Sequence, residues 1–124
     1  MNNKRHDEAK RIGATRHAGL IGGNPYKFGA VFGVAIATVA AGERGVIERE
    51  GGYFLKVEAV GEPVTAGSAI YFEAGRADAE LHNDETDAGG ILVGFAALDL
   101  EADVPVGQVR EIEVFIDKRL HVAA

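Results

Sequence analysis

The sequence predicts an all-β protein: a small β-barrel or β-sandwich of short strands joined by Gly-rich turns, preceded by an extended N-terminal arm. Three observations lead to this prediction. Apolar residues alternate with polar or small ones in several short segments, glycine accounts for 17 of the 124 residues, and turn-forming residues separate the segments. A period of two places alternate side chains on opposite faces of a strand. Several such strands, at a spacing of about ten residues, are typical of a small barrel or sandwich.

Residues 1–19 are predicted to form a basic arm in front of a β-rich domain over residues 20–124. Residues 1–28 hold six basic and two acidic side chains, whereas the rest of the chain holds seven basic and seventeen acidic ones, and the net charge is −6. Such asymmetry is typical of an arm that contacts a partner, although it also suits a flexible tail whose charge keeps it solvated. The candidate contact residues of the arm are Lys4, Arg5, Lys10, Arg11 and Arg16.

The first part of the β-rich domain opens with "GLIGGNPYKFG", which is predicted to be a loop. A strand follows in which Phe32, Val34 and Ile36 share one face. The segments "GVIERE" and "GYFLKVEA" are then predicted to pair as a hairpin across Gly51 and Gly52, because glycine accepts the positive φ of a tight turn.

The second part of the domain contains two more alternating segments, around Ile70 and around Val114. Between them, "GRADAELHNDETDAGG" is predicted to be a long exposed loop with at most one weak strand. "ILVGFAALDL" is predicted to be a strand buried on both sides, with a short helix as the alternative. The tail "KRLHVAA" either extends the last strand or leaves the body.

Two segments of the chain are similar to each other: "VFGVAIA" at 31–37 and "LVGFAAL" at 92–98. We interpret this similarity as two buried strands that converged on small residues. In the alternative interpretation, Gly33 and Gly94 each permit a close backbone approach or a bend inside a curved strand.

The familiar patterns of catalytic sites are missing from the sequence. Cysteine is absent, which excludes thiol nucleophiles and zinc-thiolate sites. The loop "GLIGGNPYKFG" does not bind phosphate in the usual way, because Lys27 is followed by Phe28 and not by Ser or Thr. Ser68, the single serine, has no Gly-x-Ser-x-Gly context and is predicted to be a turn hydroxyl that bonds to the backbone.

The one compact group of ligand-type side chains comprises His82, Asp84, Glu85 and Asp87. It lacks the spacing of a calcium loop, so we interpret it as a solvated acidic loop, with a weak divalent-cation site as the alternative. We therefore predict no catalytic residue, no metal and no cofactor. The chain also has no apolar start and no long apolar run, so we expect a soluble protein made in the cytoplasm.

The order of the sequence blocks is informative about the family. A Gly-rich entry is followed by "FGAVFGVAIATVAAGERGVIEREGGYFLKV", "GEPVTAGSAIYFEA", "GGILVGFAALDLEA" and "VREIEVFID". This order resembles a family of small tailed-phage and prophage proteins, the capsid decoration or cement proteins, some of which have carried a recombinase-like label. The resemblance covers residues 20–117, and residues 1–19 look longer and more basic than the start expected for the family.

The resemblance implies a compact β-rich body that binds the outside of an assembled phage head and holds neighbouring major capsid subunits together. It implies a homo-oligomer, with a trimer favoured and a dimer as the alternative, located on the virion and in the host cytoplasm during assembly. The arm residues would then contact the capsid or a neighbouring copy. Membrane and nucleic-acid partners are not expected.

Two other classes of function stay open at the level of sequence. A small barrel can enclose a ligand, so a ligand-binding or other non-catalytic interaction module is the main alternative. An enzyme that uses the group around His82 for metal-assisted hydrolysis is the least favoured.

Overall fold

The computed structural model describes residues 10–29, 31–76, 78–84 and 90–117, together with the backbone of Val122 and Ala123. Every regular element of these residues is a β-strand, which confirms the all-β prediction. The described part of the chain contains no helix that is long and apolar enough to cross a bilayer. The arm residues before Lys10 lie outside the described part.

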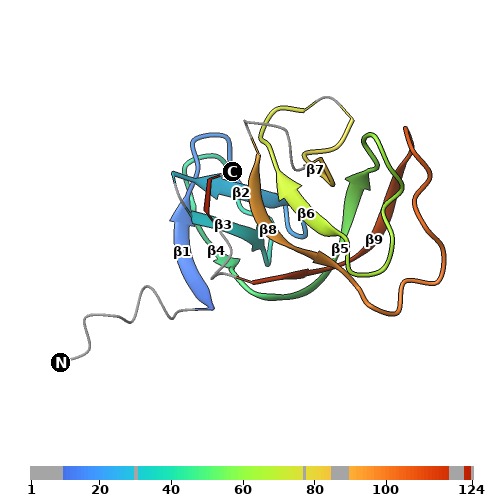
Figure 1. The fold of residues 1–124 in the computed structure, drawn as a ribbon. Helices are drawn as coiled ribbons and strands as arrows, with labels where there is room; N and C mark the ends of the chain where they lie inside the picture. The colour runs from blue at the N-terminus through green and yellow to red at the C-terminus, as the bar shows by residue number, and fades with distance from the viewer. Residues whose placement is uncertain (1–9, 30, 77, 85–89, 118–121, 124) are drawn as a thin grey trace.

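The N-terminal half is a curled sheet with the strand order β1-β4-β3-β2, and all of its pairings are antiparallel. It lies beside the barrel in Figure 1. Its strands are β1 (Arg11–Thr15), β2 (Pro25–Phe28), β3 (Val31–Ala35) and β4 (Arg44–Glu48).

The C-terminal half is a closed barrel of five strands, because β8 pairs with both β6 and β9 and so joins the two ends of the order β8-β6-β7-β5-β9. Closure removes the free edges of the sheet. Only the pairing of β5 with β7 is parallel. The barrel strands are β5 (Gly51–Glu58), β6 (Ala69–Phe72), β7 (Leu81–His82), β8 (Ile91–Ala96) and β9 (Val109–Ile116), and β10 (Val122–Ala123) adds to β8.

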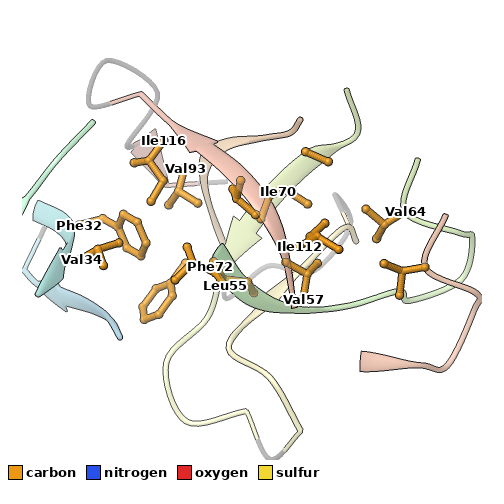
Figure 2. Packing of buried hydrophobic residues seen from close by; sticks show 14 of the residues in the cluster. Phe32, Val34, Leu55, Val57, Val64, Ile70, Phe72, Val93, Ile112 and Ile116 are labelled. Atoms are coloured by element: carbon orange, nitrogen blue, oxygen red, sulfur yellow. The ribbon is translucent and has the colours of Figure 1, made fainter. Parts of the chain in front are cut away.

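The barrel interior is filled by the apolar faces of its strands, as the period-two pattern predicts. Leu55, Ile70 and Val114 are almost fully buried there. The cluster continues into the N-terminal half through Phe32, whose ring centroid lies 4.9 Å from that of Phe72. Figure 2 shows most of the cluster, in which Phe32 lies beside Phe72. One continuous core therefore joins the sheet to the barrel.

The predicted hairpin across Gly51 and Gly52 is wrong. Strand β4 pairs with β1 and β3, and β5 pairs with β9 and β7, so each of the two strands already has a partner on both sides. Gly51 has a φ of 127°, and the two glycines carry the chain from the sheet into the barrel. Gly51 and Gly52 are the first two residues of β5 and pair with β9, so they form no turn, and only the positive φ expected for a glycine here is observed, at Gly51.

Three other predictions about elements are corrected. "GLIGGNPYKFG" is only partly a loop, because β2 occupies residues 25–28. Ile36 is exposed, because β3 ends at Ala35. Residues 11–15, which were assigned to the arm, form β1 and pair along their whole length with β4. In contrast, "ILVGFAALDL" contains the predicted buried strand, β8.

The two halves share one topology. The order β1-β4-β3-β2 in the sheet corresponds to β5-β9-β8-β6 in the barrel. The similar segments "VFGVAIA" and "LVGFAAL" lie in β3 and β8, which are equivalent strands in this comparison. Their pairings agree as well, because Ala35 opposes Ile47 in the sheet and Ala96 opposes Val114 in the barrel. The structure therefore favours an internal repeat over the convergence of two unrelated strands.

Four similar turns reinforce this equivalence. In each, an apolar residue precedes a glycine by three positions, the glycine has a φ between 77° and 87°, and a strand starts two residues later. A backbone hydrogen bond of 3.0–3.1 Å closes each turn, as in a type II turn, which requires positive φ at its third position. The apolar residues form two bridged pairs, Leu20 with Val39 and Val64 with Val104. The four glycines are Gly23, Gly42, Gly67 and Gly107.

The halves differ in closure. In the barrel, residues 73–90 separate β6 from β8 and include β7, which fills the space between β5 and β6. In the N-terminal half, only residues 29 and 30 separate β2 from β3. A short connection leaves no chain for a strand equivalent to β7, so the N-terminal sheet stays open.

Candidate interaction surfaces

Two side chains that the sequence identified as candidates for chemistry, those of Ser68 and His82, have structural roles in the fold. The Oγ of Ser68 accepts a hydrogen bond of 2.9 Å from the backbone N–H of Thr65, as the turn interpretation predicts. His82 is fully buried in β7, and its Nδ1 accepts a hydrogen bond of 3.0 Å from the N–H of Asp84. The prediction of an exposed loop is therefore wrong at His82, because β7 lies between two barrel strands.

The described residues contain no group of three or more His, Asp or Glu side chains that could hold a metal ion. Glu85 and Asp87 lie outside the described part, so the cation question for the whole acidic loop stays a prediction. The interior of the barrel is occupied by side chains such as Val57 and Val93, both at 0% exposure. A ligand enclosed by the strands would have to displace this packing.

An apolar surface, formed by Phe95, Leu98 and Phe115, lies on the outside of the barrel. Phe95 and Phe115 oppose each other across β8 and β9, with ring centroids 5.8 Å apart and ring planes inclined by 28°. Leu98, in the turn after β8, is 76% exposed. Phe115 lies over Gly52, where an added Cβ would come within 3.0 Å of its ring. Exposed apolar groups that gather in this way mark interaction sites more often than scattered ones do.

An acidic barrel face adjoins the outer side of β5 and β9. A hollow of about 350 Å³ has an apolar floor that includes Leu100 and Ile112, and Phe54, which is 67% exposed, stands at its edge. One basic side chain, Arg110, also lines this hollow, and the acidic side chains around it are Asp99, Glu101, Asp103, Glu111 and Glu113. We refer to these five residues and Phe54 as the acidic barrel face.

A basic sheet face, formed by Arg11 and Arg44, lies at the far side of the N-terminal half. The register places both residues on one face of β1 and β4, with Gly13 between them. The guanidinium of Arg44 covers Gly13, which has no side chain to obstruct it. Arg11 donates a 2.7 Å hydrogen bond from Nε to Oε2 of Glu48.

The other predicted contact residues of the arm are placed separately. The carbonyl of Lys10 accepts a 2.6 Å hydrogen bond from the N–H of Arg49, so Lys10 continues the pairing of β1 with β4. The guanidinium of Arg16 lies 5.0 Å from the ring centroid of Tyr26 and donates to the carbonyl of Gly19. Lys4 and Arg5 lie outside the described residues. Their role, and that of the arm as a whole, stays a prediction.

Glu48 joins the basic sheet face to the barrel. Its carboxylate accepts hydrogen bonds from the hydroxyl of Tyr53, at 2.6 Å, and from Arg11. These two donors, first Tyr53 and then Arg11, lower the pKa of Glu48 below its ordinary value of 4.5. Burial and the carboxylate of Glu48 raise the pKa of Tyr53. The group is therefore a charge-assisted link between the two halves.

These observations describe a rigid scaffold that carries three distinct outer surfaces. The model of the family described as phage cement protein matches residues 5–111, most of the chain. The chain belongs to the phage cement protein family. No match was found among curated proteins or among solved structures.

As a member of the cement family, the chain is a phage structural protein, which agrees with the resemblance seen in the sequence. The family match also begins earlier than that resemblance did. It starts at residue 5 and includes all of β1, so much of the basic N-terminal segment is a family feature and not an addition.

The surface residues of this cement-family chain were largely missed from the sequence. A usable signal was present, because Phe54 and Phe115 occupy the polar register of alternating strands, where charged residues are expected. The repeated turns were also visible as an apolar residue followed by glycine at the third position, starting at Leu20, Val39, Val64 and Val104.

Proposed function

We propose that this protein binds the exterior of a phage capsid and stabilises the contacts between major capsid subunits. Membership of the cement family supports a structural role in the phage particle. The cluster of Phe95, Leu98 and Phe115 on the outside of a closed barrel supports a contact surface. Burying exposed apolar groups contributes about 25 cal/mol per Å². A barrel without free edges presents these groups in a fixed arrangement, which reduces the entropy cost of binding.

The proposal includes the partners and location implied by the family. The major capsid protein is the main partner, and the protein itself forms a homo-oligomer, for which a trimer is favoured over a dimer. Several copies of one weak contact, repeated in a symmetric assembly, give a large gain in avidity. The virion surface is the final location, and the host cytoplasm is the place of assembly. In this role the chain acts as a surface and not as an enzyme.

The basic arm is proposed to add a second contact, through Lys4, Arg5, Lys10, Arg11 and Arg16. Its positive charge stands out against the acidic remainder of the chain. The structure supports different roles within this group, because Arg11 and Arg16 contact residues of the N-terminal sheet, whereas Lys4 and Arg5 precede the sheet in the chain.

The test compares two exposed aliphatic residues on expanded phage heads that lack the protein. Leu98→Asp places a charge in the apolar surface, and Ile21→Asp is the matched control because Ile21 is also well exposed, at 57%, but lies in the N-terminal half. We expect Leu98→Asp to lower head occupancy at least tenfold and to abolish the gain in the disruption temperature of the heads. Ile21→Asp should bind like the wild type. Equal occupancy for the two variants would contradict the role of this surface, and failure of the wild type to bind any matured head would contradict the function.

A further inference from the structure

The two halves of the chain share one topology but differ sharply in charge. Residues 10–49 contain six basic and two acidic side chains, whereas residues 50–117 contain three basic and fifteen acidic ones. The halves lie side by side in Figure 1, with β1 at the outer edge of one and the loop before β9 at the outer edge of the other. The charge of the molecule is therefore unevenly distributed between its two halves.

The basic sheet face carries positive charge that is available for a contact with another molecule. Arg11 is paired with Glu48, but its side chain keeps 66% exposure. Arg44 is exposed and forms no ion pair with any described residue. Thr15, which opposes Arg44 across β1 and β4, is exposed on the same face.

The acidic barrel face is complementary to the basic sheet face in charge. Its five carboxylates form no ion pair within the described part of the chain. The neighbouring Arg110 donates to the side chain of Gln108. Phe54 and the apolar floor of the hollow suit the hydrocarbon stem of an Arg or Lys side chain, which can pack there while its charged end reaches a carboxylate.

We infer that the acidic barrel face of one copy binds the basic sheet face of a second copy. A second copy is the occupant because every molecule carries a basic surface of complementary charge in a fixed place, on the paired strands β1 and β4. The two faces belong to different halves, so the contact is head to tail, and such a contact closes into a ring when its rotation permits. This inference rests on the proposed function, because it specifies the contact of the proposed homo-oligomer.

The experiment uses charge-reversed variants and native mass spectrometry with light scattering over a range of concentration and salt. Arg44→Glu combined with Arg11→Gln removes the basic sheet face. Glu101→Lys combined with Asp103→Asn removes part of the acidic barrel face. Lys27→Glu and Glu62→Lys are matched controls, because both residues are exposed and lie outside the two faces.

We expect a wild-type oligomer that dissociates as salt screens the contact, and association at least tenfold weaker in each of the two face variants. Both controls should assemble like the wild type. Thermal unfolding of each variant identifies any that fail to fold. If the double variant with Arg44→Glu and Arg11→Gln fails to fold, Arg44→Gln alone replaces it, and it should associate more weakly than wild type.

A wild-type protein that is monomeric at low salt would overturn the inference, as would face variants that assemble normally. These results distinguish a failure of the head-to-tail contact from a failure of the proposed capsid function. A monomer that still binds phage heads overturns only the head-to-tail contact, whereas an oligomer that follows the charge pattern but binds no head overturns only the capsid role.

Discussion

At the scale of single residues, Glu48 links three strands that come from both halves of the molecule. Its own strand is β4, Arg11 belongs to β1, and Tyr53 belongs to β5. Tyr53 also donates to the carbonyl of Glu50, at 3.0 Å, so its hydroxyl spans the junction between the sheet and the barrel. Hydrogen bonds to an ionised group are stronger than neutral ones, which makes this junction sensitive to the charge of one carboxylate.

The lowered pKa of Glu48 predicts a specific acid sensitivity. Because the folded pKa lies below the unfolded one, the carboxylate stabilises the native state above about pH 4.5, and this contribution disappears as the pH falls through the folded pKa. Glu48→Gln should cost about 1–2 kcal/mol at pH 7. The difference from wild type should shrink as the pH falls below about 4.5, as measured by urea unfolding at a series of pH values. A constant difference across the series would exclude this role.

Two glycines show how a single missing side chain permits a strand contact. A Cβ on Gly94 would collide with the carbonyl of Phe115, and a Cβ on Gly33 would come within 2.8 Å of the carbonyl of Glu48. The two glycines occupy equivalent strands and approach equivalent partners. The close-approach interpretation of the repeated segments is therefore supported by both halves.

At the scale of elements, β1 changes how the N-terminal segment has to be tested. Five consecutive residues of β1 pair with β4, and Ile12 faces Ile47 across this pairing. A truncation that ends before Lys10 removes only residues outside the described part of the chain, but one that continues to residue 19 removes a strand. Only the shorter truncation isolates the proposed arm contact.

We expect deletion of residues 2–9 to leave the thermal unfolding temperature within about 3 °C of wild type, while occupancy on phage heads falls severalfold through the loss of Lys4 and Arg5. Deletion of residues 2–19 should lower the unfolding temperature by more than about 10 °C, because it uncovers the edge of β4. Differential scanning calorimetry and head binding measure the two effects. Unchanged occupancy of the shorter truncation would contradict the arm contact, and a fully stable longer truncation would contradict the structural role of β1.

Element prediction succeeded where the signal was local. The alternation around Ile70 and Val114 identified β6 and β9 correctly, since each strand buries one face on the barrel core. The pairing of β4 and β5 was predicted incorrectly because the glycine pair was interpreted as a turn, whereas Gly51 and Gly52 begin β5 and pair with β9. Strand β2 was missed because its start at Pro25 and its four-residue length resemble a loop.

At the scale of the whole molecule, the sheet and the barrel share one core. Phe32 is fully buried and packs on Phe72 of the barrel, so neither half buries its apolar surface alone. The charge-assisted link through Glu48 and Tyr53 joins the same two halves at the surface. The halves are therefore expected to unfold together, despite their separate hydrogen-bonded sheets.

Phe32→Ala should destabilise the protein by about 3–5 kcal/mol, the usual cost of deleting a buried aromatic ring. The unfolding transition should stay single, with circular dichroism and tyrosine fluorescence giving the same midpoint in urea. Phe28→Ala is a control at a half-buried site in the neighbouring strand β2 and should cost much less. Two separate transitions, with an intact barrel after the sheet has melted, would show that the shared core does not couple the halves.

The sequence by itself determined the all-β class, most of the strands, the glycine turns and the resemblance to cement proteins. All of these depend on patterns within a few neighbouring residues, such as a period of two or a glycine at a fixed offset. The tertiary structure alone decided the closure of the barrel by β7, the equivalence of the two halves, the burial of His82, and the meeting of Phe95, Leu98 and Phe115. Each depends on pairing between residues that are distant in the chain, and local sequence carries little information about which distant strands pair.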